Sequence, residues 1–250
     1  MQKRGISQEG LKLIACVTML IDHIGATLVA RALQEGWFLD SAAGIDFYYA
    51  LRIIGRIAFP IYCFLLVEGA CHTRSPKKYA LRLFVGVLLS EIPFDLAFSF
   101  RGRVFFDWTS NSVMITLLLG FLMIEVMRKV KGFWKVVVIL PFYIAAELLN
   151  TDYAGLGILV IAVFALTRGL KHEKLLRVIG LLAVLSSGSG NFQIGSVWIS
   201  LESLAIFALI PIFLYDERKL THNKAVQWAF YLFYPVHTAI LALLEVLIFG

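Results

Sequence analysis

Residues 11–31 read LKLIACVTMLIDHIGATLVAR, an apolar run with two ionisable residues, Asp22 and His23, near its middle. A helix needs about 20 mainly apolar residues to cross a bilayer, so this run is long enough to span one. An ionisable residue at the centre of a spanning helix costs roughly 2.5–3.5 kcal/mol on insertion scales. Two adjacent ones predict that other polar groups of the chain meet them at the same depth.

The composition is typical of a multi-pass membrane protein. Of the 250 residues, 60% are hydrophobic and 16% are charged, whereas soluble domains have about 45–50% and about 25%. Apolar segments are predicted at residues 11–31, 47–70, 79–99, 111–127, 133–149, 154–168, 175–189, 196–215 and 226–249. No soluble domain fits between them. We therefore expect an all-α fold, a polytopic membrane helix bundle of about nine transmembrane helices that forms one domain over residues 1–250.

The lysines and arginines indicate how these segments are oriented. When the nine segments alternate in direction, eighteen basic residues fall on the side of the N-terminus, and Arg31, Arg101 and Arg103 fall on the other side. The positive-inside rule then predicts a cytoplasmic N-terminus. This bias also accounts for the net charge of +6, so we expect no nucleic acid partner. The three cysteines lack metal-ligand spacing, and we expect no metal.

Several ionisable side chains are predicted to share the depth of His23. At 1.5 Å per residue, each lies roughly 14–18 Å into its segment, near the middle of a core about 30 Å thick. They are His23, Arg56, Glu91 and His237, with Arg52 and Asp95 about one turn further out. Intramembrane ionisable groups of this kind mark functional sites by default.

The spacing of these groups predicts how they pair. Arg52 and Arg56 are four residues apart, as are Glu91 and Asp95, so each pair occupies one face of its helix. We expect the two arginines to face the two carboxylates, either as a structural clamp or as part of a site. Asp22 is expected to meet an arginine, which leaves His23 to face a cavity or to be a satisfied core histidine. Glu202 is isolated and is expected to be structural.

Five stretches of the chain together resemble the TraX family of bacterial membrane proteins, named for a conjugative-plasmid protein that N-acetylates pilin. They are LKLIACVTMLIDHIGA, LRIIGRIAFPIYCFLLVEGACHTRSPKKYALRL, SEIPFDLAF, TSNSVMITLLLG and FYLFYPVH, with weaker support from DYAGLG. Residues 215–220 read YDERKL where the resemblance leads us to expect YNGKRG. This departure argues against assuming the pilin substrate.

The resemblance implies an enzyme of the bacterial cell membrane that is distantly related to the transmembrane acyltransferases. Such a protein moves an acetyl group from cytoplasmic acetyl-CoA to a hydroxyl or amine acceptor at the outer face. His23 would then be the general base or acyl carrier, and His237 a second candidate. Arg52 or Arg56 would stabilise the oxyanion or hold Asp22, Glu91 and Asp95 in place. Side chains at the inner rim would bind acetyl-CoA: His72, Arg74, Lys77, Lys78, Arg82 and Tyr234.

Two other classes of protein remain open from the sequence. A proton-coupled transporter also places carboxylates, arginines and histidines inside the membrane, although no inverted repeat is visible. A structural membrane assembly factor would use the ion pairs only to hold helices together. That reading leaves the shared depth of His23 and His237 unexplained.

Overall fold

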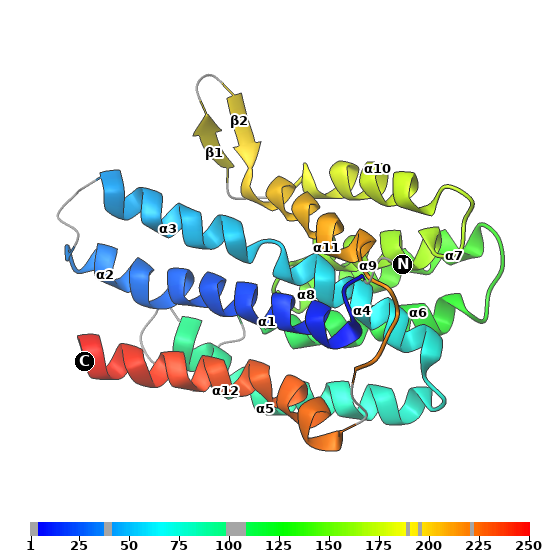
Figure 1. Ribbon diagram of the computed structural model, residues 1–250, viewed down its shortest axis with the longest axis horizontal. Coiled ribbons are helices and arrows are strands. Elements are labelled where there is room, and N and C mark those ends of the chain that lie inside the picture. Colours follow the sequence, from blue (N-terminus) through cyan, green and yellow to red (C-terminus); the bar gives the residue numbers. More distant parts are fainter. Residues whose placement is uncertain (1–4, 38–41, 99–108, 189–190, 195–196, 221–222) are drawn as a thin grey trace.

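The computed structural model describes residues 5–37, 42–98, 109–188, 191–194, 197–220 and 223–250. Four basic residues that entered the predicted topology, Lys3, Arg4, Arg101 and Arg103, lie outside these ranges. Within them the chain is a helical bundle, as predicted (Figure 1). Each of the nine predicted apolar segments contributes a helix.

The first segment forms one long rod of three consecutive helical elements. α1 (Gln8–Ile24) begins after Ser7, whose side chain accepts a hydrogen bond from Gly10 N at 3.1 Å and so caps the helix. A single π-helical stretch, η1 (Gly25–Val29), follows directly after His23, and α2 (Ala30–Gln34) completes the rod. Isolated π turns inside α-helices are frequent at functional sites.

The second segment forms α3 (Ala42–Gly55) and α4 (Ala58–His72), which are separated by a short break at Arg56. α3 packs against α1 at Gly55, where an added Cβ would lie 2.1 Å from the Cβ of Asp22. Only glycine permits this approach, since any side chain would displace Asp22. α1 and α3 therefore approach each other closely at the buried charge.

The remaining elements complete the bundle (Figure 1). They are α5 (Pro76–Phe98), α6 (Val113–Met127), α7 (Trp134–Val137), α8 (Ile139–Leu148), α9 (Ala154–Thr167), α10 (Glu173–Leu185), β1 (Asn191–Ile194), β2 (Val197–Ser200), the 3-10 helix η2 (Leu201–Ala208), α11 (Leu209–Phe213) and α12 (Lys224–Phe249). α12 lies along α5, and α4 is the most completely buried helix, with Ile61, Cys63 and Ala70 fully inaccessible to solvent.

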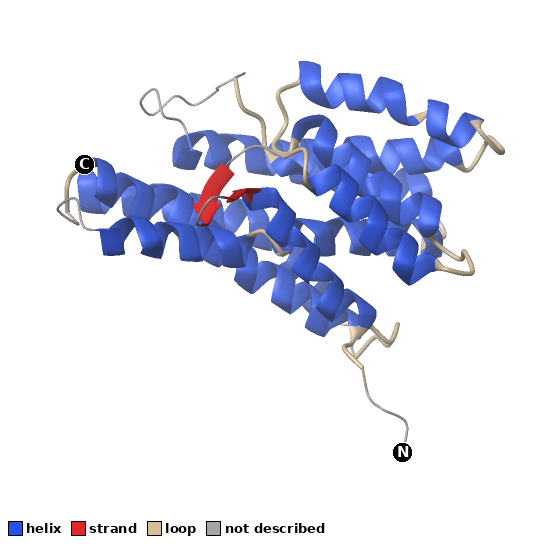
Figure 2. Cartoon of the chain, turned by 90° about the horizontal axis from the view of Figure 1, so that it is seen from above, coloured by secondary structure: helices blue, strands red, loops and turns tan. Residues whose placement is uncertain are grey.

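The predicted eighth segment differs from expectation at its beginning. Residues 197–200 are the strand β2, which pairs antiparallel with β1 and projects from the helical body as a hairpin (Figures 1 and 2). The branched and aromatic residues of VWIS favour a strand as much as a helix. The helix that follows is shorter than predicted.

Among the described residues, three helical stretches are long and apolar enough to cross a membrane by their length and composition. They are Gln8–Gln34, Ala42–His72 and Ala225–Phe249. Shorter apolar helices occupy Val113–Met127, Ala154–Thr167 and Leu201–Phe213. The protein is thus a membrane protein, while the count of nine spans and the cytoplasmic N-terminus stay predictions.

The start of the chain is tied to the loop that precedes α12. Ile6 N donates to Leu214 O at 2.7 Å, Asp216 N donates to Ile6 O at 3.0 Å, and Gln8 N donates to Arg218 O at 2.9 Å. In the same loop Glu217 has a φ of 61°, in the left-handed region that favours glycine. Glycine is also the residue that the family resemblance leads us to expect at this position.

We expect Glu217→Gly to raise stability, because glycine adopts this backbone conformation without steric strain. The apparent melting temperature in detergent should rise by about 2 °C, as for a gain near 1 kcal/mol. Glu217→Ala removes the same carboxylate but keeps a Cβ, and it should not be stabilised. Equal melting temperatures for the two variants would contradict a backbone origin.

Candidate functional site

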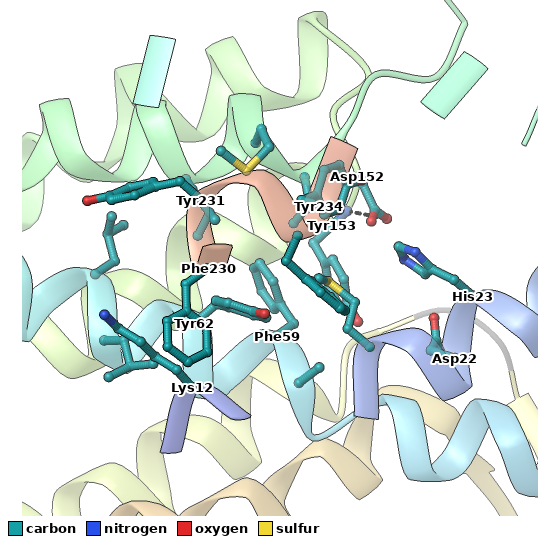
Figure 3. Close-up of a pocket in the computed structure, with 18 of the residues that line it drawn as sticks. Lys12, Asp22, His23, Phe59, Tyr62, Asp152, Tyr153, Phe230, Tyr231 and Tyr234 are labelled. Carbon is teal, nitrogen blue, oxygen red and sulfur yellow. Dashed lines mark hydrogen bonds between the residues drawn. The ribbon is translucent and has the colours of Figure 1, made fainter. Parts of the chain in front are cut away.

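A central cavity of about 950 Å³ runs along the first rod. Nine residues of the rod line it, most of them at roughly helical intervals: Gln8, Glu9, Lys12, Met19, Asp22, His23, Ala26, Ala30 and Gln34. From Gln8 to Gln34 the helix rises about 39 Å at 1.5 Å per residue. The central cavity therefore extends along a length that exceeds the roughly 30 Å hydrocarbon core of a bilayer. Figure 3 shows how side chains from several helices surround it.

Two buried histidines meet at the wall of the central cavity. His23 Nδ1 lies 2.7 Å from His237 Nε2, and the two ring planes are inclined by 19°. This separation is that of a hydrogen bond and is too short for face-to-face stacking, so the rings meet edge to edge. His23 lines the central cavity, whereas His237 lies behind it. The predicted common depth of the two histidines is confirmed as direct contact.

The hydrogen bonds around this pair determine which nitrogen atoms carry protons. His237 Nδ1 lies 2.7 Å from Phe233 O, and a carbonyl only accepts, so His237 Nδ1 is protonated. Neutral His237 then presents Nε2 as an acceptor, and His23 Nδ1 must donate to it. Neutral His23 is consequently unprotonated at Nε2. The geometry leaves that nitrogen as a base, with His237 as the residue that sets its tautomer.

Asp22 lies between Arg52, near the end of α3, and Arg56, at the break between α3 and α4. Arg52 Nη1 lies 2.6 Å from Asp22 Oδ2, and Arg56 Nη2 lies 2.8 Å from Asp22 Oδ1. Arg56 Nη1 also lies 3.2 Å from Glu202 Oε1 on η2. The two positive charges are thus matched by two carboxylates from different elements. The predicted contact of Asp22 with an arginine is confirmed.

The expected partners of the arginines were wrong in part. Arg52 and Arg56 pair with Asp22 and Glu202 within the described residues, rather than with Glu91 and Asp95. Glu91 instead accepts hydrogen bonds from the backbone and side chain of Ser112, at the start of α6. Sequence spacing placed the two arginines on one face of the second segment and the two carboxylates on one face of the third, but it could not show which helix lies opposite each face.

Asp152 is a site residue that the sequence analysis missed. It lines the central cavity from a turn before α9, and Figure 3 shows its carboxylate and the His23 imidazole both directed into the cavity. The next residues, Tyr153 and Ala154, have φ of 62° and 40°. Left-handed conformations of this kind cost energy and cluster at functional sites. The Tyr153 ring stacks on Phe59 with centroids 3.8 Å apart, which holds the turn against α4.

Tyr234 contributes a polar side chain to the lining of the central cavity. Its ring meets that of His23 edge to face, with centroids 5.9 Å apart. The side chain is 5% exposed, and its hydroxyl has no hydrogen-bond partner among the described residues. An unpaired buried donor of this kind costs free energy as long as nothing accepts its hydrogen bond.

The residues expected to bind acetyl-CoA divide into two groups. His72, Arg82 and Tyr234 line the central cavity. Arg74, Lys77 and Lys78 are exposed and do not line it. Two further basic residues, Lys12 and Lys219, also line the central cavity. They were not among the residues expected from the sequence. Among the described residues, no three His, Cys, Asp or Glu side chains gather to hold a metal ion.

We expect Arg56→Ala to destabilise the protein strongly, because it leaves Asp22 and Glu202 with uncompensated charge inside the bundle. Breaking a buried ion pair typically costs about 3–5 kcal/mol. Arg31→Ala is the matched control, since Arg31 pairs with Glu35 at the surface with both side chains over 40% exposed. Thermal unfolding in detergent should show a large fall for the first variant alone. Equal stability of both would refute the role of this ion-pair network.

The site can now be compared with known proteins. A family model described as TraX protein matches residues 7–245. The chain is 31% identical over 246 residues to the "Probable fimbrial assembly protein FimC, serogroup H1" of Dichelobacter nodosus, covering 92% of each chain. It is 29% identical over 174 residues to an uncharacterized protein of Rickettsia prowazekii, covering 67% of this chain and 57% of that one. No solved structure matches. The matched range contains Asp22, His23, both arginines and His237, and the chain belongs to the TraX family.

Proposed function

We propose that this protein is an integral-membrane acyltransferase of the bacterial cytoplasmic membrane. It moves an acetyl group from cytoplasmic acetyl-CoA to a hydroxyl or amine acceptor at the outer face. One observation carries the proposal: an unprotonated nitrogen of a buried histidine faces a cavity that extends along the full length of a membrane-length rod. A base in that position serves reactants that arrive from opposite ends.

The chain's own residues supply each role that such a transfer needs. His23 Nε2 takes the proton from the acceptor as it attacks the thioester carbonyl, and then returns it to the departing thiolate of CoA. His237 accepts from His23 Nδ1 throughout and keeps the imidazole in its productive tautomer, as an orienting partner does for other catalytic histidines. Attack by His23 Nε2 itself, through a transient acetyl-histidine, uses the same geometry.

Two further residues of the central cavity fit the reaction. The unpaired Tyr234 hydroxyl is a donor for the carbonyl oxygen as negative charge develops on it. The Asp152 carboxylate, directed into the same space, would hold the N–H or O–H of the acceptor. Arg52, Arg56 and Asp22 are positioning residues in this scheme, because they fix the part of α1 that carries His23.

Lys12, Arg82 and Lys219 make one end of the central cavity basic, which suits an anionic donor. Gln34 and Tyr48 line the opposite end, which we assign to the acceptor. The basic end is the side that the distribution of lysines and arginines predicts to be cytoplasmic.

A structural role in pilus assembly is the second candidate, because a relative is named as a probable fimbrial assembly protein. The ion-pair network of Asp22, Arg52, Arg56 and Glu202 would then serve only to hold helices together. Binding of acetyl-CoA separates the two candidates, since an assembly factor has no need of a thioester.

The first measurement is acetyl-CoA binding to detergent-purified protein by calorimetry. We expect saturable binding by wild type and by His23→Ala, because His23 acts in the chemical step. In membrane vesicles supplied with acetyl-CoA that is radioactively labelled in its acetyl group, we expect only wild type to transfer the label to acceptor molecules. Absence of binding by folded wild type would overturn the acyltransferase proposal and favour the assembly role.

The two histidines should differ in their effect on transfer. His23→Ala removes the base and should lower the initial rate by about 10²–10⁴-fold. His237→Ala leaves the base but frees its tautomer, so its loss should be smaller. Tyr234→Phe keeps the ring packing and should reduce the rate by up to about 10²–10³-fold, as for an oxyanion donor. A larger loss for His237→Ala than for His23→Ala would reverse the assignment.

A further inference from the structure

The turn that carries Asp152 is strained at three positions. Asn150, Tyr153 and Ala154 have φ of 44°, 62° and 40°, in the left-handed region that residues other than glycine rarely adopt. Residues in such conformations persist only where the surrounding structure holds them in place. The contacts made by residues 150–154 therefore determine whether the Asp152 carboxylate stays in the central cavity.

Thr116, on α6, binds this turn at Asp152 itself. Its Oγ1 lies 2.6 Å from Asp152 O and 2.9 Å from Thr151 Oγ1. Because a carbonyl only accepts, the Thr116 hydroxyl donates to Asp152 O, and the Thr151 hydroxyl donates to Thr116. Thr116 is fully inaccessible to solvent and Thr151 is nearly so. Both hydroxyls are therefore satisfied by protein groups, and Thr116 joins α6 directly to the backbone of Asp152.

The Thr116 hydroxyl is used differently from those of other buried helical threonines. A threonine inside a helix can donate to the carbonyl four residues earlier in the same helix. Four buried threonines do so at 2.7–2.9 Å: Thr18, Thr27, Thr167 and Thr238. Thr116 instead donates to a carbonyl 36 positions later in the chain. Its hydroxyl thus supports the turn and not its own helix.

The beginning of α6 is fixed from two sides. Asn111 N donates to Asn150 O at 2.9 Å, and Asp152 N donates to Asn111 O at 2.7 Å. The next residue, Ser112, donates from its backbone and side chain to the buried carboxylate of Glu91 on α5. The turn is therefore bound to α6, and α6 is bound in turn to α5. This gives Glu91, which the proposed reaction does not otherwise use, a place in the support of Asp152.

We propose that Thr116 is a positioning residue for Asp152. Its hydroxyl holds the strained turn, and the turn holds the Asp152 carboxylate in the central cavity, where it binds the acceptor. The use made of Asp152 rests on the proposed function, whereas the position of its side chain does not. Thr116→Val keeps the shape of the side chain but removes the donor, so the turn can relax and withdraw the carboxylate from the cavity. Thr116→Ser keeps the donor.

The first test measures where the side chain of residue 152 points, independently of any reaction. Asp152→Cys is made in a Cys71→Ser background, because Cys71 is the exposed one of the three native cysteines. The probe is 2-aminoethyl methanethiosulfonate, and mass spectrometry of detergent-purified full-length protein follows its addition to the thiol. We expect Thr116→Val to slow this modification about 10-fold or more, because the rate depends on exposure of the thiol. Thr116→Ser should leave the rate nearly unchanged.

Thr167→Val is the matched control for this test. It also removes a buried threonine hydroxyl, but one that donates within its own helix and does not line the central cavity. The control should be modified at the same rate as the protein with native Thr167. Equal modification rates in Thr116→Val and Thr167→Val would overturn the positioning role.

The second test measures the initial rate of acetyl transfer in membrane vesicles with native Asp152. We expect Thr116→Val to lower this rate about 10–100-fold, as for a misplaced binding group, and Thr116→Ser to retain most of it. Slower modification combined with unchanged transfer would overturn the assignment of Asp152 to the acceptor. Slower modification combined with no transfer by wild type would retain the positioning and overturn the proposed function instead.

Discussion

The approach of α3 to α1 at Gly55 is the constraint on which the rest of the structure depends. It brings two guanidinium groups onto Asp22, and Glu202 supplies the second negative charge from a distant part of the chain. Charges at this depth are tolerable only when they are paired, so the four groups must assemble together. Their assembly fixes the rotation of α1 about its axis. Asp22 then faces the arginines, and the neighbouring His23, about 100° around the helix, faces the central cavity.

His23 has an orienting hydrogen-bond partner, as the histidines of known catalytic triads do, but the kind of partner differs. A carboxylate commonly fills that position, and it would stabilise a protonated imidazole by charge. Here the partner is a neutral histidine whose own orientation is set by a backbone carbonyl one helical turn earlier. With both rings neutral the pair carries no net charge, which suits a site that is buried among apolar helices. The cost of protonating His23 during a reaction is correspondingly higher.

Much of this could be predicted from the sequence, and the misses have physical reasons. Segment length and hydropathy located the helices, because apolar runs that long have few alternatives. Depth counting brought His23 and His237 together, since the rise per residue is constant. The partners of Arg52 and Arg56 could not be predicted, because the spacing of residues within a helix defines a face but does not indicate which helix packs against it. Glu202 looked isolated since its partner lies 146 residues earlier. Asp152 was missed because a strained turn has no hydropathy signal, although the DYAGLG motif pointed to its position.

The bond between His23 and His237 joins residues 214 positions apart, from the first helix and the last. During synthesis at about 5–20 residues per second, His23 would wait about 10–40 s before its partner is made. All the other helices have been synthesised by then, and the loop before α12 contacts the first residues of the chain. In the proposed reaction, an unfinished chain would therefore lack a properly oriented base. Competence would come only with the final helix, and truncated products of translation would be inert.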